Sequence, residues 1–116
     1  METIATPTSN STINLALDTI KQGKQALIFC NTKRGAEKTA EEIGKKIKDI
    51  VNQELADRAR KAMSKPTKQC ERLARCLRHG VAFHHAGLYS KQKDLVEGKF
   101  REKEISIIAC TPTLAA

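Results

Sequence analysis

Three short segments of this sequence combine hydroxyl groups, and in two cases glycine and basic side chains, in a way that suits anion binding. The first reads Asn31-Thr32-Lys33-Arg34-Gly35, the second runs from His84 to Lys93, and the third begins Thr111-Pro112-Thr113. Free backbone N–H groups at a helix N-terminus, together with hydroxyls and cations, bind phosphate-like groups. Ordinary helix capping by Thr32 or Ser90 explains each segment taken alone. Anion binding is therefore indicated by the three segments together.

Each of these segments follows a short apolar run. The runs are Ala26–Cys30, Val81–His84 and Ile105–Ala109, and the first of them shows no polar alternation, as is typical of a strand covered on both faces of a parallel sheet. Helical patterns lie between the runs, so the order strand, helix, strand, helix, strand predicts right-handed βαβ units. Loops that follow parallel strands leave at the carboxyl edge, where ligands bind. We therefore expect all three segments at one edge of an α/β fold.

The helical patterns mark the rest of the organisation. They begin at Ser11 or Thr12, at Asn31 or Thr32, at Thr67 and at Ser90. We expect residues 1–10 to be a flexible lead-in and residues 11–116 to form one partial domain, with a polar helical insert at 52–66. The chain stops shortly after the third strand enters its loop, and we expect it to be part of a larger protein.

Composition narrows the class of partner. The 116 residues carry a formal net charge of +8, which favours a polyanion such as nucleic acid. Aromatic residues make up only 3%, which argues against a module that binds single strands through many stacked rings. Neither a signal peptide nor a membrane-length apolar stretch is visible, and the four cysteines form no C-x-x-C pair. We expect a reduced, cytoplasmic protein.

Several catalytic classes are disfavoured by missing motifs. The sequence has no G-x-x-x-x-G-K-[ST] phosphate loop, no Asp-Glu pair after a strand to hold magnesium, and no nucleophile elbow. Candidate zinc ligands are present at Cys70, Cys76, His79, His84 and His85. However, Cys70 and Cys76 are six residues apart on an expected helix and face different directions, which disfavours a zinc site. We expect no metal site and no catalytic residue in this chain.

Three stretches also resemble a known family. These are Ala26–Ala40 (ALIFCNTKRGAEKTA), Val81–Leu88 (VAFHHAGL) and Ile107–Ala116 (IIACTPTLAA), and they resemble motifs IV, IVa and the opening of motif V in the second motor domain of superfamily-two helicases. The similarity is greatest to the archaeal Hjm-type, Ski-like DNA helicases. It runs from about Ser11 to the end of the chain.

The resemblance implies a RecA-like domain that packs against a first RecA-like domain carrying the Walker motifs. ATP and Mg²⁺ would bind mainly to that absent domain, and ATP turnover would drive movement along single-stranded or forked DNA, three-prime to five-prime, in repair and replication-fork processing. Carried over by position, the resemblance implies phosphate contacts from six residues: Thr32, Arg34, Gly87, Lys93, Thr111 and Thr113.

This sequence departs from the family pattern in three places. Lys93 stands where many relatives have arginine, which keeps the charge without the bidentate fork. Motif V stops before its usual Gly-Val-Asn, and motif VI is absent along with the Walker motifs. We expect this chain alone to hydrolyse no ATP. The alternative is a stand-alone basic α/β module that binds nucleic acid.

Overall fold

The computed structural model describes residues 2–5, 9–62 and 67–112, with side chains from Ser11 onward. Its four strands are β1 (Glu2–Ala5), β2 (Ala26–Phe29), β3 (Val81–His84) and β4 (Ile107–Cys110). All neighbouring strands are parallel, and their order in the sheet is β1-β2-β4-β3. The predicted α/β class with a parallel sheet is confirmed.

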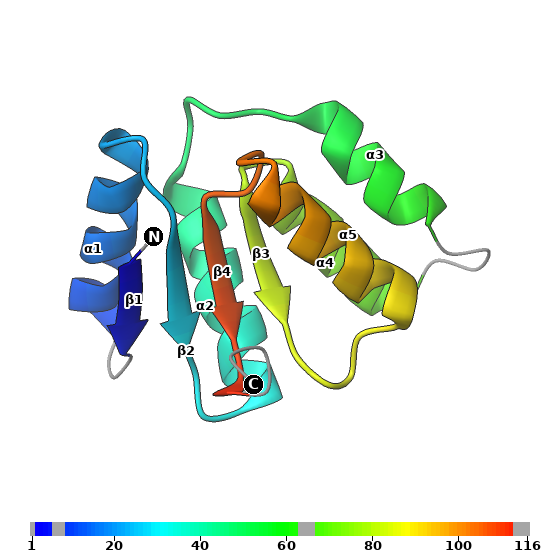
Figure 1. Ribbon diagram of the computed structural model, residues 1–116, viewed down its shortest axis with the longest axis horizontal. Helices are drawn as coiled ribbons and strands as arrows, with labels where there is room; N and C mark the ends of the chain where they lie inside the picture. Colours follow the sequence, from blue (N-terminus) through cyan, green and yellow to red (C-terminus); the bar gives the residue numbers. More distant parts are fainter. Residues whose placement is uncertain (1, 6–8, 63–66, 113–116) are drawn as a thin grey trace.

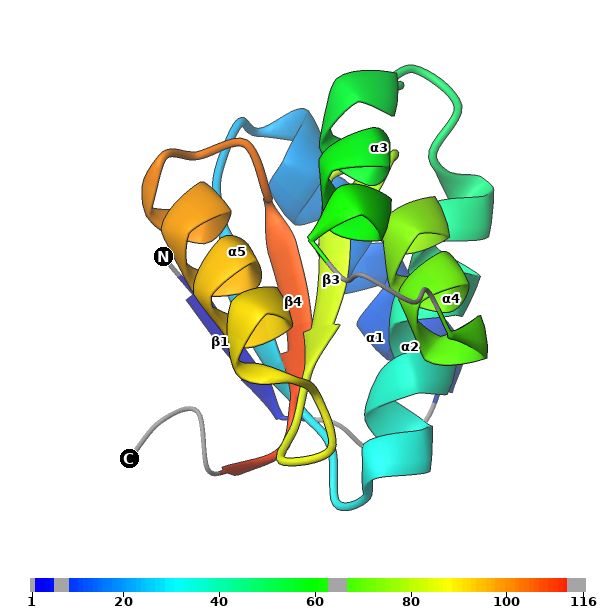
Figure 2. The ribbon, with the colours of Figure 1, turned by 90° about the vertical axis from the view of Figure 1, so that its right-hand side faces the viewer.

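Five helices complete the three layers. They are α1 (Ser9–Lys21), α2 (Lys33–Lys46), α3 (Gln53–Lys61), α4 (Lys68–Leu77) and α5 (Ser90–Arg101). Figures 1 and 2 show α5 alone on one face of the sheet and α1, α2 and α4 on the other, with α3 packed against α4. This arrangement is compatible with part of a RecA-like domain.

The sheet has one strand more than the sequence predicted. Residues 2–5, expected to be part of a flexible lead-in, form β1 and pair with β2 in the register Glu2↔Ala26 to Ala5↔Phe29. The segment Glu-Thr-Ile-Ala contains two strand-favouring residues, Thr3 and Ile4, but four residues are too few to predict a strand from local sequence. The strand forms by pairing with the backbone of β2. Helix α1 also begins earlier than expected, at Ser9.

The core lies between the sheet and the helices that cover it. Every residue of β3 and β4 is buried, whereas β2 alternates, with Ala26 and Ile28 buried and Leu27 and Phe29 only partly so. Alternate side chains of a strand point to opposite faces. The partly buried pair therefore faces the side of the sheet that carries only α5, which packs next to β3.

The predicted insert contains a helix, but its packing differs from a purely polar surface segment. Leu55, Ala56 and Ala59 of α3 are buried, on the side of the helix that packs against α4. The Asn52 side chain caps the helix by accepting a hydrogen bond from the Leu55 N–H at 3.1 Å. Residues 63–66 of the expected insert lie outside the described residues.

Candidate nucleic-acid interface

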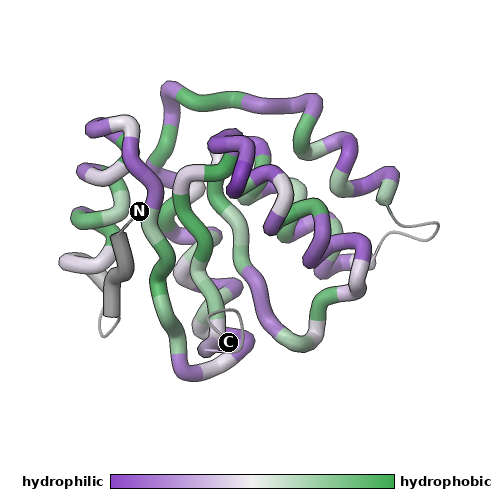
Figure 3. Tube along the Cα trace, in the orientation of Figure 1, coloured by the Kyte–Doolittle hydropathy of each residue, from purple (hydrophilic) through white to green (hydrophobic). Residues whose placement is uncertain are grey.

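The carboxyl ends of β2, β4 and β3 lie side by side. The Cys30 N–H donates to the Cys110 carbonyl at 2.7 Å, and the Thr111 N–H donates to the His84 carbonyl at 3.2 Å. The loops at residues 30–32, 85–89 and 111–112 therefore leave from one edge of the sheet, which we call the carboxyl edge (Figure 1). Figure 3 shows hydrophobic strands β2 and β4 leading into a hydrophilic turn between β2 and α2 at this edge.

Thr32 caps α2 at the carboxyl edge. Its Oγ1 accepts a hydrogen bond from the Gly35 N–H at 2.9 Å. A hydroxyl that accepts one bond can still donate its own hydrogen, so Thr32 retains a donor for an anion oxygen. Arg34, the second residue of α2, is exposed and has no salt bridge to any residue that the structure describes.

Lys33 is a basic residue of this edge that is not among the six predicted contact residues. A Cβ added to Gly87 would lie 3.8 Å from Lys33 Cδ, so the Lys33 stem passes beside the loop that follows β3. Its ammonium group therefore extends from a point where the loops after β2 and β3 meet. There was a reason in the sequence to consider Lys33, because it lies between Thr32 and Arg34. Its proximity to Gly87, in contrast, could be seen only in the structure.

Gly87 contributes close packing in this conformation. Its N–H donates to His85 Nδ1 at 3.0 Å, so that amide already has a partner. A Cβ at this position would lie 3.0 Å from His85 Cε1, which is too close for any larger residue without a shift of the ring. The expected phosphate contact of Gly87 stays a prediction.

His85 connects the carboxyl edge to two helices. Its Nε2 lies 2.7 Å from Glu37 Oε2 on α2, and Arg72 of α4 donates to Glu37 Oε1 at 2.9 Å. Arg72 also donates to both carboxylate oxygens of Glu41, at 3.0 and 2.6 Å. This chain of charge-assisted hydrogen bonds fixes the loop after β3 relative to α2 and α4.

Helix α5 begins differently from the prediction. Tyr89, and not Ser90, is its N-cap residue, and the Tyr89 N–H donates to Gln92 Oε1 at 2.9 Å. The sequence favoured Ser90 because serine is a common cap, whereas here a buried glutamine from within the helix supplies the acceptor. Lys93 is half-buried in the first turn of α5, near the carboxyl edge.

The structure places five of the six predicted contact residues at or beside the carboxyl edge. Thr32, Gly87 and Thr111 lie in the three loops of the carboxyl edge, and Arg34 and Lys93 lie in the first turns of the helices that leave it. Thr113 falls outside the described residues. Three surface hollows, of about 270, 420 and 600 Å³, are lined by residues of α2 to α5 and of the segments beside these helices.

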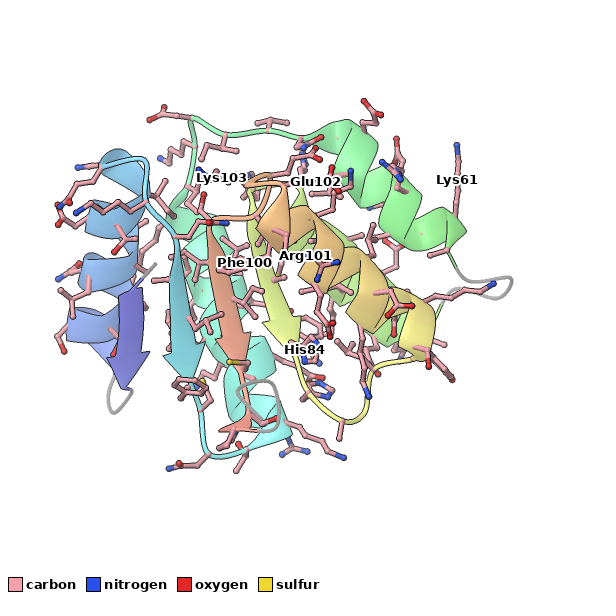
Figure 4. The ribbon with its side chains drawn as sticks, in the orientation of Figure 1. Lys61, His84, Phe100, Arg101, Glu102 and Lys103 are labelled. Atoms are coloured by element: carbon pink, nitrogen blue, oxygen red, sulfur yellow. The ribbon has the colours of Figure 1, made fainter. Side chains whose placement is uncertain are left out.

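The histidines and cysteines that are candidate zinc ligands in the sequence form other contacts or are buried in the structure. His84, at the carboxyl end of β3, places Nε2 2.7 Å from Glu97 Oε2 (Figure 4). Burial raises the pKa of the Cys76 thiol to about 12, which keeps it protonated. Within residues 2–5, 9–62 and 67–112, no three His, Cys, Asp or Glu side chains are grouped to hold a metal ion.

Comparison with known proteins shows strong similarity to one kind of protein. The chain is 40% identical over 111 residues to the ATP-dependent DNA helicase Hel308 of Methanocaldococcus jannaschii, which covers 91% of this chain and 9% of that protein. Hel308 of Methanocella arvoryzae is 41% identical over 89% of the chain and 15% of its own length, and Hel308 of Pyrococcus abyssi is 45% identical over 92% and 15%. No family model matches the chain.

The resemblance predicted from the three motifs is therefore confirmed. About nine tenths of the chain corresponds to a segment of archaeal Hel308 helicases, and that segment spans only 9 to 15% of the relatives just described. Among the described helices, none has both the length and the apolar character needed to cross a membrane.

Proposed function

We propose that this chain is part of the second motor domain of an ATP-dependent DNA helicase. Its carboxyl edge contacts the phosphates of single-stranded DNA through Thr32, Arg34, Gly87, Lys93, Thr111 and Thr113. The similarity to Hel308 helicases carries the proposal, because it extends over about nine tenths of the chain. Those relatives are named as ATP-dependent DNA helicases, and the proposal transfers that activity to the parent protein of this chain.

The geometry of the carboxyl edge supports the contact with phosphates. Thr32 retains a hydroxyl donor, and Lys33 and Arg34 are exposed cations without a described ion-pair partner. The first turn of α2 also presents backbone N–H groups with no intrahelical acceptor, at the positive end of the helix dipole. A net charge of +8 adds a general attraction for polyanions.

The remaining parts of the motor lie outside this chain in the proposal. ATP and Mg²⁺ bind mainly to a first RecA-like domain of the same protein, which packs against this one. The chain alone is inactive as an ATPase, because it carries neither a Walker phosphate loop nor motif VI. Movement three-prime to five-prime, a forked substrate and a cytoplasmic location extend the proposal by resemblance.

A stand-alone basic nucleic-acid-binding module is the second candidate. It is favoured by one observation: Lys33 and Arg34 are exposed at the carboxyl edge and have no ion-pair partner among the described residues. It predicts DNA binding by this chain with no link to ATP.

ATP hydrolysis stimulated by single-stranded DNA distinguishes the two candidates. The measurement compares this chain with the gene product extended in both directions, with and without DNA. Activity confined to the extended protein supports the helicase. DNA binding by this chain, with no stimulated hydrolysis by either protein, would favour the stand-alone module.

A further inference from the structure

His85 is an almost completely buried polar residue directly behind the proposed DNA-binding surface. Only 2% of it is exposed, and its ring stacks on Phe83 with the ring centres 5.7 Å apart. Both ring nitrogens have a partner: Nδ1 faces the Gly87 N–H, and Nε2 faces a carboxylate oxygen of Glu37. A buried ring with two opposed partners has one favoured orientation.

These partners also determine where the ring carries its proton. The Gly87 N–H is a donor, so Nδ1 must offer a lone pair to accept from it. The proton of the neutral ring then sits on Nε2, which donates to Glu37. The assignment follows from the hydrogen-bond network, since the donor at one nitrogen and the acceptor at the other leave no second arrangement for a neutral ring.

Glu37 is itself held in place. Its side chain is 14% exposed and accepts from Arg72, which in turn is bound to Glu41. Lys33 is the further charged residue near this loop, with its stem beside Gly87. The ring of His85 therefore cannot turn away from Gly87 without breaking a short hydrogen bond to a nearly buried carboxylate.

The turn after β3 closes on His85. The Leu88 N–H donates to the His85 carbonyl at 3.1 Å, and the Gly87 N–H donates to the His85 ring. The same residue thus holds residues 86–88 through both its backbone and its side chain. Because the Lys33 stem passes beside Gly87, the shape of this turn limits the space open to the Lys33 side chain at the carboxyl edge.

We propose that His85, as the neutral ring with its proton on Nε2, is a positioning residue for DNA binding. It holds the turn at 86–88, and through it Lys33, in the arrangement that receives a DNA phosphate. This inference rests on the proposed function, and it assigns to His85 no direct contact with DNA.

Two substitutions separate the two hydrogen bonds of the ring. In His85→Asn the amide oxygen takes the place of Nδ1 and can still accept from Gly87, whereas the contact with Glu37 is lost. In His85→Gln the longer side chain reaches Glu37 with its NH₂ group and leaves Gly87 without an acceptor. We expect His85→Asn to bind labelled single-stranded oligo(dT) within about threefold of the wild type, because the bond that holds the turn is kept. His85→Gln should bind about tenfold more weakly, because the hydrogen bond from the Gly87 N–H, which holds the turn, is the one it loses.

The salt dependence supplies a readout that a merely structural defect does not share. Because His85 holds Lys33 through the turn at 86–88, His85→Gln should lower the magnitude of the slope of log affinity against log salt toward that of Lys33→Ala, whereas His85→Asn should keep the wild-type slope. The matched variant Lys33→Ala should reduce the magnitude of that slope by about 0.7. Thermal melting establishes that each variant is folded.

Three outcomes would overturn the inference. His85→Asn and His85→Gln could weaken binding equally, or neither could weaken binding, or His85→Gln could keep the wild-type salt slope. A ¹⁵N NMR spectrum of the wild-type ring tests the same premise where a variant does not fold, because a proton on Nδ1 would contradict the assignment and a proton on Nε2 alone supports it. Absence of DNA binding by the wild type would overturn the proposed function together with this inference, whereas a binding wild type with indistinguishable variants overturns the inference alone.

Discussion

Arg72 of α4 donates two hydrogen bonds to the Glu41 carboxylate of α2, at 2.6 and 3.0 Å, and a third to Glu37. The bidentate pair joins two helices that are far apart in the sequence. Its hydrogen bonds hold the pKa of the Glu41 carboxyl below its usual value of 4.5. A carboxyl group whose pKa is lower in the folded state stabilises the fold above its unfolded pKa, and this contribution is lost as the pH falls through the folded value.

We therefore predict that Arg72→Met makes the protein more sensitive to acid. Without the guanidinium, Glu41 loses its lowered pKa and Glu37 loses one of its partners, so the midpoint of acid unfolding, followed by circular dichroism, should move to higher pH. Lys68→Met is the matched control, because Lys68 is exposed on the same helix, has no described salt bridge and is not among the charges that lower the Glu41 pKa. Equal acid midpoints for the two variants would contradict the role given to Arg72.

The buried thiols predict a loss of stability at alkaline pH. Burial raises the pKa of Cys76 and of Cys110 from 9.0 to about 12. Between these values the unfolded chain has lost the thiol proton and the folded chain retains it, so stability falls as the pH rises above 9. Each thiol contributes a slope of about 1.4 kcal/mol per pH unit. Urea unfolding at pH 8, 9 and 10 measures the slope, and Cys110→Ala should reduce it; an unchanged slope in that variant would count against the buried thiol as its source.

Lys103 offers a stabilising substitution. It follows α5 with a φ of 65°, in the left-handed region that favours glycine, and its side chain is exposed (Figure 4). Lys103→Gly should raise the free energy of unfolding by about 1 kcal/mol, because glycine adopts this conformation without the steric cost. Lys103→Ala removes the same charge but keeps a Cβ and should give no such gain. A gain from alanine equal to that from glycine would show that the charge matters and not the backbone.

The main elements of the fold follow from local sequence. Apolar runs such as Ala26–Cys30 and the helical stripe of α4 are strong, short-range patterns, and they place β2, β3, β4 and four of the helices well. Strand β1 could not be predicted in the same way. It is a four-residue strand at the edge of the sheet, and its pairing with β2 comes from tertiary structure.

The candidate site was predictable only at the level of loops. Parallel-sheet logic placed the segments after β2, β3 and β4 at one edge, and their backbone hydrogen bonds confirm this. The partnership between His85 and Glu37 was not predictable, because 48 residues separate them and neither has a distinctive local pattern. The predicted N-cap of α5, Ser90, was also wrong. Serine is a common cap, but here the Gln92 side chain accepts from the Tyr89 N–H, and Tyr89 is the N-cap residue.

Binding of labelled single-stranded DNA over a range of salt concentrations tests the central claim most directly. Wild type, Arg34→Ala, Lys93→Ala and the control Lys48→Ala are compared on two unrelated sequences; Lys48 is exposed and lies beyond the far end of α2 from Thr32. We predict that Arg34→Ala and Lys93→Ala each weaken binding by a similar factor on both sequences and lower the magnitude of the salt slope by about 0.7, while Lys48→Ala changes neither. Wild-type affinity and slope in both edge variants would contradict the claim that the carboxyl edge holds the DNA phosphates.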